Sequence, residues 1–474
     1  MRRSLGIAVG LVIAVMSALA IVRWNVWSYG TDTGTFAQIA HNAFHGFTDG
    51  PEHGTHFRFH WSPILALLWP IVAATRSPLG IQIAQVVLIA ITAIPLAAIV
   101  RTYAGEKWAL RVAVLALIYP PLLSASFEEF HELAFYPVTA LALFWAADRA
   151  RWIWFAVFAL AAVLIREDAC VDLLLIGIAL GIIGLVKRQS AQGGLLYGEP
   201  IAPNGLAVAG FALAAVSAAV LALYAYVIVP HAGGWAPSHF YRYPFADGPA
   251  QTALAIFTHP LALGASVLTL GRLTYLLEAF APLAFLPLRT RWVWLALPGF
   301  AGVLLASDSI VWRMGFHYEL LWAPWLLLAA AWALIRIAQR SEPAARRWWT
   351  AAVAICVIVL AAFNPMHPAH YLTRAPYQHS SDVTSAFACV PRDARVATHD
   401  EWFAHEALTY PHSTNIEEGV QHFDGYIAYT PAWRNAYVET HVLPQLRAAL
   451  RQGRYSMACR SGGVLVLRPS RTAE

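Results

Sequence analysis

Long apolar stretches separated by short polar loops make up the first three-quarters of the chain. A bilayer crossing needs about 20 mostly apolar residues, and cytoplasmic loops are enriched in Lys and Arg. Together these two rules predict about eleven transmembrane helices. The expected spans are residues 5–23, 79–100, 108–124, 132–148, 152–166, 170–187, 206–229, 265–287, 292–307, 317–338 and 347–363.

The segment 61–75 (WSPILALLWPIVAAT) is too short for an ordinary span and contains Pro63 and Pro70. If it crossed the membrane, every later loop would change sides and most cations would lie outside, against the charge rule. We therefore expect an interfacial or re-entrant helix on the outer face. It belongs to an expected outer-face region of loops and surface helices over residues 28–78.

The pattern changes after residue 363, where polar residues become frequent and no further span occurs. Helix-like stretches at 381–390 and 434–452 alternate with strand-like ones at 395–399, 425–430 and on both sides of the turn at 461–463. This predicts a transmembrane domain over 1–363 and a small soluble α/β domain over 364–474, on the periplasmic or extracytoplasmic side. Cys389 and Cys459 fall in this outer domain as either a disulfide or two free thiols.

Composition agrees with a membrane protein of the plasma (inner) membrane. Hydrophobic residues make up 59% of the chain and charged residues 12%, whereas soluble domains carry about 25% charged residues. The net charge of +5 comes mainly from Arg in presumed inner loops, so it reports topology and gives no sign of a nucleic-acid partner. Membrane lipid is the expected surrounding.

Asp32 lies in the first outer loop, just after the first span. The spacing of apolar residues from Thr33 onward predicts an amphipathic surface helix, capped by Asp32 or Thr33. Asp32 is therefore either a helix cap or a carboxylate at the membrane boundary that acts as a general base or a metal ligand. The same loop contains His56, Arg58 and His60, which suit an interfacial surface, phosphate binding or metal ligation.

The second outer loop contains Glu128, His131 and Glu132 between two apolar spans. Their spacing would place them on one helical face, and ionisable groups at membrane depth usually mark function. The third outer loop is very short and holds Arg166, Glu167 and Asp168. Arg166 is a candidate clamp for a lipid-linked phosphate, or else the partner of an ion pair with Glu132 or Asp32.

His317 and Tyr318 follow in a later outer loop. By the predicted topology, acidic, imidazole and guanidinium groups from several loops meet on one side of the membrane. That shared location is the strongest functional signal in the sequence, since each loop alone is weak evidence.

Several motifs resemble a known family. The order DTGTFAQ (32–38), HWSP (60–63), FEEFHEL (127–133), RED (166–168) and GFHYELLWAP (315–324) resembles the predicted membrane proteins grouped as domain of unknown function 2079. That family is similar to the GT-C superfamily of membrane glycosyltransferases, which includes protein O-mannosyltransferases and lipid A aminoarabinose transferases. The resemblance implies sugar transfer with inversion from a polyprenyl-phosphate sugar to a glycan, lipid or protein acceptor at the outer face. The DTG pattern here departs from the DE or DD pair of the characterised branches.

The combined hypothesis is a membrane glycosyltransferase. Its predicted catalytic residues are Asp32, Glu128, His131 and Glu132, and its predicted binding residues are His56, Arg58, His60, Arg166, Glu167, Asp168, His317 and Tyr318. A divalent cation (Mg²⁺ or Mn²⁺) is a candidate cofactor at Asp32, Glu128 and His131. Two other classes fit the same pattern: a transporter or flippase of a lipid-linked or anionic substrate, and a non-catalytic membrane scaffold.

Overall fold

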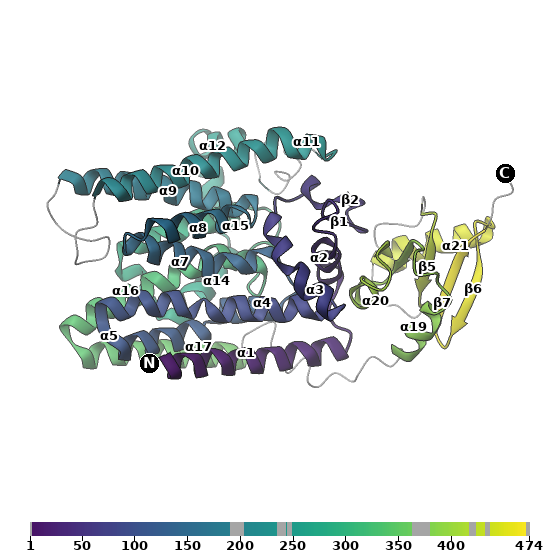
Figure 1. Ribbon diagram of the computed structural model, residues 1–474, viewed down its shortest axis with the longest axis horizontal. Helices are drawn as coiled ribbons and strands as arrows, with labels where there is room; N and C mark the ends of the chain where they lie inside the picture. Colours follow the sequence, from purple (N-terminus) through teal and green to yellow (C-terminus); the bar gives the residue numbers. More distant parts are fainter. Residues whose placement is uncertain are drawn as a thin grey trace.

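The computed structural model describes residues 2–189, 203–234, 243, 249–362, 380–416, 423–431 and 437–470. Figure 1 shows a bundle of roughly aligned helices with a smaller, sheet-containing domain beyond one end. Between the two lie α2 (Thr31–His41), α3 (Trp69–Thr75) and the hairpin of β1 (Thr48–Asp49) and β2 (Gly54–Thr55). The predicted domain boundary at 363/364 falls outside the described residues.

The bundle combines long helices with shorter, broken ones. The long helices are α1 (Arg2–Asn25), α5 (Ala93–Leu117), α9 (Glu167–Gln189), α10 (Pro203–Leu223), α16 (Ala323–Arg340) and α17 (Glu342–Ala362), and the shorter α4 (Leu79–Ile91) leads directly into α5. Shorter ones are α6 (Pro120–Phe127), α7 (Tyr136–Asp148), α8 (Trp152–Val163), α11 (Val229–His231), α12 (Pro249–Thr258), α13 (Pro260–Val267), α14 (Leu270–Phe280) and α15 (Leu297–Leu304). Single turns include η1 (His56–Arg58), η2 (Pro63–Leu68), η3 (Glu132–Phe135), η7 (Leu286–Arg289), η8 (Arg291–Ala296) and η9 (His317–Leu321).

Among the described residues, five helices are long and apolar enough to cross a membrane, or six if the bent pair Pro260–Val267 and Leu270–Leu283 forms one span. One of the five, Leu79–Leu117, is 39 residues long and is interrupted at Gly105, whose φ of +74° breaks the helix. This break lies in the predicted inner loop between two of the expected spans. The chain is thus a multi-pass helical membrane protein, while the count of eleven spans stays a prediction, because several bundle helices are short.

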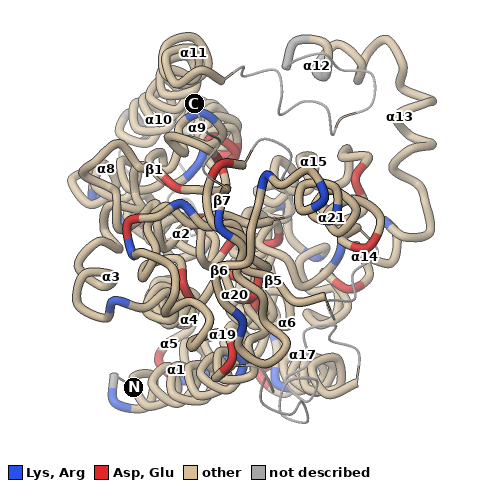
Figure 2. Tube along the Cα trace, turned by 90° about the vertical axis from the view of Figure 1, so that its right-hand side faces the viewer, with Lys and Arg blue, Asp and Glu red and all other residues tan. Residues whose placement is uncertain are grey.

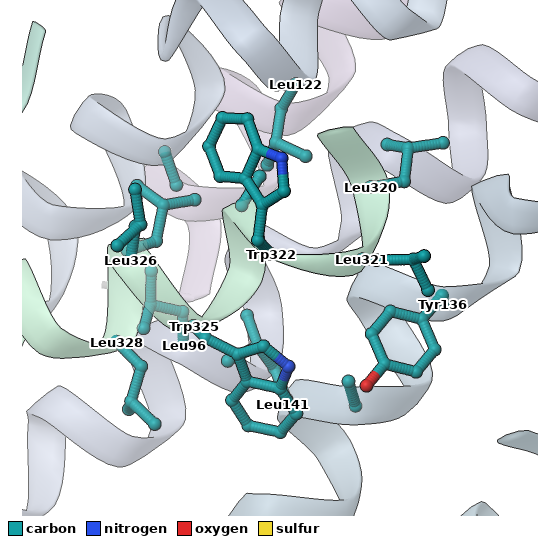
Figure 3. Close-up of a cluster of buried hydrophobic side chains, with 14 of the residues drawn as sticks. Leu96, Leu122, Tyr136, Leu141, Leu320, Leu321, Trp322, Trp325, Leu326 and Leu328 are labelled. Carbon is teal, nitrogen blue, oxygen red and sulfur yellow. The ribbon is translucent and has the colours of Figure 1, made fainter. Parts of the chain in front are cut away.

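Two tryptophans anchor the apolar core at the start of α16. Trp322 and Trp325 are fully buried, and Figure 3 shows them among leucines from neighbouring elements. Trp322 stacks on Phe300 with ring centroids 4.7 Å apart, and its indole N–H donates to the Tyr275 hydroxyl over 2.8 Å. Buried indoles need such a partner. This packing fixes the end of the loop that carries His317 and Tyr318.

The segment 61–75 forms η2 and α3, a short 3₁₀ turn followed by seven helical residues. Both proline residues start a helical element, where a missing N–H costs no hydrogen bond. In Figure 1, α2 and α3 lie across the end of the bundle. Residues Thr33 to Ala40 of α2 are all buried, so the predicted amphipathic helix on the membrane surface is wrong. The helix begins at Thr31 with Gly30 as its N-cap, and no side chain caps it. The predicted cap by Asp32 or Thr33 is therefore wrong, since both residues already lie in the first turn.

The C-terminal domain contains a five-stranded sheet in the order β4-β3-β5-β7-β6. Its strands are β3 (Val396–Thr398), β4 (Ser413–Asn415), β5 (Tyr426–Tyr429), β6 (Tyr455–Ser461) and β7 (Val464–Pro469), with helices α19 (Ser380–Phe387), α20 (Asp400–Glu406) and α21 (Leu443–Arg451). Strands β4, β3 and β5 are parallel, while β7 is antiparallel to both β5 and β6. Cys389 and Cys459 form a disulfide with Cα atoms 6.5 Å apart, which ties the end of α19 to β6.

The C-terminal domain packs directly on α2. Gln38 donates its amide N–H to the carbonyl of Ala407 over 3.0 Å, and Asn415 donates to the Thr31 hydroxyl over 2.8 Å. Gly34 permits the close approach, because a Cβ there would lie 2.6 Å from the ring of Phe403. The helix that carries Asp32 is therefore held between the bundle and the outer domain.

Candidate functional site

A cavity of about 280 Å³ lies where the loops meet beside α2. Figure 2 looks onto this end of the molecule, with charged segments concentrated around its centre and apolar helices such as α8 and α13 at the periphery. The cavity is lined by Asp32, Thr35, Phe36, Glu52, His56, His60, Glu128, His131, Arg166, Ile310, Phe316, His317 and Tyr318. Eight of these were predicted from sequence as catalytic or binding residues on four different loops, namely Asp32, His56, His60, Glu128, His131, Arg166, His317 and Tyr318.

Asp32 and Glu132 contact the same imidazole. Nε2 of His131 lies 3.2 Å from Oδ2 of Asp32, and its Nδ1 lies 3.8 Å from Oε2 of Glu132. The Asp32 side chain is 55% exposed, whereas that of Glu132 is fully buried. Burial alone would lower the pKa of His131, but the contacts with both carboxylates outweigh it and raise the pKa to about 10. His131 is therefore cationic at neutral pH.

A buried ion pair joins the second and third loops. Nη1 of Arg166 lies 3.1 Å from Oε1 of Glu132, and its Nε lies 3.1 Å from Oδ2 of Asp168. The Arg166 side chain is only 6% exposed. Of the two partners proposed from sequence, Glu132 is the one in contact, while Asp32 reaches the same network through His131.

Glu167 links the third loop to the surface segment. Its Oε1 lies 2.6 Å from Nδ1 of His60, and its Oε2 accepts the backbone N–H of Trp61 over 2.9 Å. The indole N–H of Trp61 donates to the carbonyl of Val163 over 2.8 Å. The third loop thus fixes His60 beside Arg166, whose Nη2 lies 3.4 Å from Nε2 of His60.

The loop containing Glu128 is not helical. Helix α6 ends at Phe127, Glu128 and His131 have extended backbone, and Glu132 begins η3. The prediction that Glu128, His131 and Glu132 share one helical face is therefore wrong. Buried amides hold this irregular backbone instead: the side chain of Gln85 donates to the carbonyl of Glu128 over 3.1 Å and accepts the N–H of His131 over 2.9 Å. Such bonds meet the requirement that buried backbone groups find partners.

Glu128 faces the last loop. Its Oε2 lies 3.7 Å from Nδ1 of His317, and the rings of His317 and His131 stack with centroids 3.3 Å apart. Burial, together with the nearby charge of Asp32, raises the pKa of Glu128 well above its usual range even though His131 acts in the opposite direction. The protonated acid is thus favoured at this position.

Four predicted residues do not line the cavity, namely Arg58, Glu132, Glu167 and Asp168. Glu132 and Glu167 contact the lining residues His131, Arg166 and His60, as described above. Arg58 is exposed on the surface and does not line the cavity. Asp168 also lies outside the cavity lining but contacts Arg166. Glu129, which the sequence did not single out, accepts the backbone N–H of Thr33 over 3.0 Å, and a Cβ at Gly30 would lie 2.7 Å from its Oε1. Only the adjacent carboxylates of the FEEF motif hinted at this role.

The predicted metal-ligand set of Asp32, Glu128 and His131 does not come together as three close ligands. Within the part of the chain that the structure describes, the residues that place three ligand atoms within 4.8 Å of one another are Asp49, Glu52 and His56. Of these, the sequence had marked only His56. The other two were missed because the hairpin of β1 and β2, and not a helical repeat, brings Asp49 and Glu52 beside His56.

Comparison with known proteins agrees with this architecture. A family model described as "Predicted membrane protein (DUF2079)" matches residues 23–466, and no curated protein sequence matches. Among solved structures, ArnT from Cupriavidus metallidurans bound to undecaprenyl phosphate is similar, with a TM-score of 0.52 and 11% identity over 96% of this chain and 97% of that one. ArnT in its apo state gives a TM-score of 0.51 at 12% identity over the same shares.

An oligosaccharyltransferase from Archaeoglobus fulgidus in complex with Zn and sulfate gives a TM-score of 0.44 at 12% identity, over 88% of this chain and 68% of that one. Because the family model covers residues 23–466, the chain belongs to the DUF2079 family of predicted membrane proteins. Its fold is similar to that of ArnT.

The contact between Glu132 and Arg166 predicts how the stability of the protein changes when Arg166 is replaced. Arg166→Met leaves the fully buried Glu132 carboxylate without its main counter-charge, which typically costs about 3–5 kcal/mol. Thermal unfolding of the detergent-purified protein should show a clear loss that Arg166→Met/Glu132→Leu partly restores. Arg313→Met, at an exposed arginine of a neighbouring loop, is the matched control. Equal stability of Arg166→Met and wild type would exclude a structural role for the pair.

The raised pKa of His131 predicts how the thermal stability of the protein depends on pH. A histidine whose pKa is raised by folding contributes stability that is complete below about pH 6.5, and this contribution is lost as pH rises through the folded pKa of about 10. The wild type should therefore lose more thermal stability between pH 7 and pH 10 than His131→Gln. The two unfolding midpoints are measured across this range in one buffer series. Parallel pH profiles would contradict the assignment of a cationic His131.

Proposed function

We propose that this protein transfers a sugar from a polyprenyl-phosphate donor to an acceptor hydroxyl at the outer face of the membrane. The proposal rests on one observation: a half-exposed carboxylate, Asp32, and a buried guanidinium, Arg166, line the same cavity. A base and an anion site in one water-accessible space are what displacement of a phosphate leaving group requires.

In the proposed reaction, Asp32 takes the proton of the acceptor hydroxyl while the oxygen attacks the anomeric carbon. The new carbon–oxygen bond forms as the bond to the phosphate oxygen breaks, and the phosphate leaves with the electron pair. One displacement inverts the anomeric carbon and needs a single base. Because the leaving group is already a stable phosphate anion, no strong general acid is required.

The surrounding residues have distinct proposed roles. Arg166, with His60, binds the lipid phosphate, since a guanidinium and an imidazole N–H are both donors that suit phosphate oxygens. His131 orients Asp32 through the 3.2 Å contact, and Glu132 holds both His131 and Arg166 in place. Glu128, His317 and Tyr318 line the wall that would meet the sugar or the acceptor. Glu167 and Asp168 position His60 and Arg166.

The GT-C-like fold supports this proposal, because the similar ArnT structure holds undecaprenyl phosphate. The distribution of Lys and Arg among the loops predicts the orientation of the chain in the membrane. We infer from it that α2, the cavity and the C-terminal domain lie on the periplasmic or extracytoplasmic side. The C-terminal domain, packed on α2, would then limit access to the cavity from the aqueous side.

Asp32→Asn tests the reaction directly. Loss of a general base typically lowers the rate by about 10²–10⁴-fold, so transfer from polyprenyl-phosphate sugars by purified protein in lipid nanodiscs should fall by that factor. Binding of the polyprenyl phosphate itself should change little. Asp393→Asn, at an exposed aspartate of the C-terminal domain, should transfer at the wild-type rate.

Normal transfer by Asp32→Asn would refute the role of the base. Wild-type protein that moves lipid-linked sugar across proteoliposome membranes without transferring it would refute the enzyme and favour a flippase.

A further inference from the structure

The surface hairpin beside the cavity gathers three metal-binding side chains. Asp49 ends strand β1, Glu52 lies in the turn, and His56 begins η1 just after β2. One ligand atom from each lies within 4.8 Å of the other two. Two carboxylates and an imidazole are ligand types that Zn²⁺ and related transition metals accept.

The backbone holds these three side chains in place before any ion arrives. The N–H of Glu52 donates to Oδ1 of Asp49 over 2.7 Å, and the N–H of His56 donates to the carbonyl of Phe47 over 2.9 Å. The N–H of Gly50 donates to the side chain of Gln38 over 2.9 Å. The hairpin is thus fastened to α2, so the ligand positions do not have to be ordered by the metal.

Burial of His56 is a second, independent observation. Its side chain is 1% exposed, and the ring packs edge-on against Phe36 with centroids 5.6 Å apart. Nδ1 lies 2.9 Å from Glu52, while the buried Nε2 has no hydrogen-bond partner among the residues that the structure describes. Nδ1 is therefore the ring nitrogen that faces Glu52 and would be available to an ion there, whereas Nε2 lies on the opposite side of the ring. A buried imidazole beside two carboxylates is more typical of a metal ligand than of a surface histidine.

We propose that Asp49, Glu52 and His56 bind one divalent transition-metal ion of the Zn²⁺ type. The site is separate from the Asp32–His131 pair, and it differs from the Mg²⁺ or Mn²⁺ site expected from sequence at Asp32, Glu128 and His131. Three protein ligands leave at least one coordination position for a water or an anion. Glu52 and His56 also line the cavity, so that open position would face the space into which Arg166 projects.

The ion would change the charge of the cavity wall. The lining contains the carboxylates of Asp32 and Glu52, the protonated acid of Glu128, and the cations Arg166 and His131. Two added positive charges at Glu52 would strengthen the attraction of this wall for an anionic ligand. Metal binding itself does not depend on the proposed sugar transfer, so the two claims are tested separately.

The test measures metal content and affinity in the full-length protein. Detergent-purified protein without its purification tag is stripped with a chelator, dialysed against ZnCl₂ and analysed by elemental mass spectrometry and calorimetry. We expect one tightly bound Zn²⁺ per chain. Asp49→Asn, Glu52→Gln and His56→Gln should each weaken binding at least as much as loss of an outer-shell partner does, about 10–100-fold.

Asp32→Asn and Asp393→Asn are the matched controls and should retain one Zn²⁺ per chain. Unfolding midpoints of the metal-free variants show whether each still folds, and zinc should raise the midpoint of the wild type more than that of Glu52→Gln. Full zinc content in Asp49→Asn/Glu52→Gln would overturn the proposal. So would loss of zinc in Asp32→Asn, or a wild type that binds none.

Discussion

The free-energy cost of burying the Glu132 carboxylate determines how the loops pack at the end of the bundle that holds the cavity. Glu132 is fully buried, and an ionised carboxylate in that position is tolerable only with a close counter-charge. Arg166 supplies it from another helix start, and His131 adds a second cation. Because these contacts join segments far apart in the sequence, they fix where α7 and α9 begin relative to each other. The cavity is the space left beside that buried pair.

The same network extends outward to the surface region. Glu167, next to Arg166, fixes His60 and the backbone of Trp61, while His131 contacts Asp32 on α2. The C-terminal domain then packs against the other side of α2 through Gln38 and Gly34. The half-exposed Asp32 carboxylate is thus supported by charged groups of the bundle on one side and by packing of the C-terminal domain against α2 on the other. This arrangement keeps one carboxylate accessible while its neighbours are buried.

Sequence patterns predicted the parts of this structure that depend on local periodicity. The apolar helices, the strands near 395–399, 425–430 and 455–469, and the gathering of polar loops all follow from hydropathy and charge. The prediction that Glu128, His131 and Glu132 share one helical face was wrong. The side chain of Gln85, distant in sequence, bonds to the backbone of this loop and stabilises an extended conformation there. The choice of Glu132 as the partner of Arg166, and the role of Glu129 beside α2, depend on distances between loops that spacing along the chain does not encode.

The proposed function requires that this cavity bind the phosphate of a lipid carrier. The most direct measurement is an experimental structure of the protein in nanodiscs with undecaprenyl phosphate. We expect the phosphate inside the cavity, within hydrogen-bond distance of the Arg166 guanidinium and close to Asp32. A phosphate bound instead at the far end of the bundle, beside Arg101 and Lys107 where α5 breaks, would contradict it.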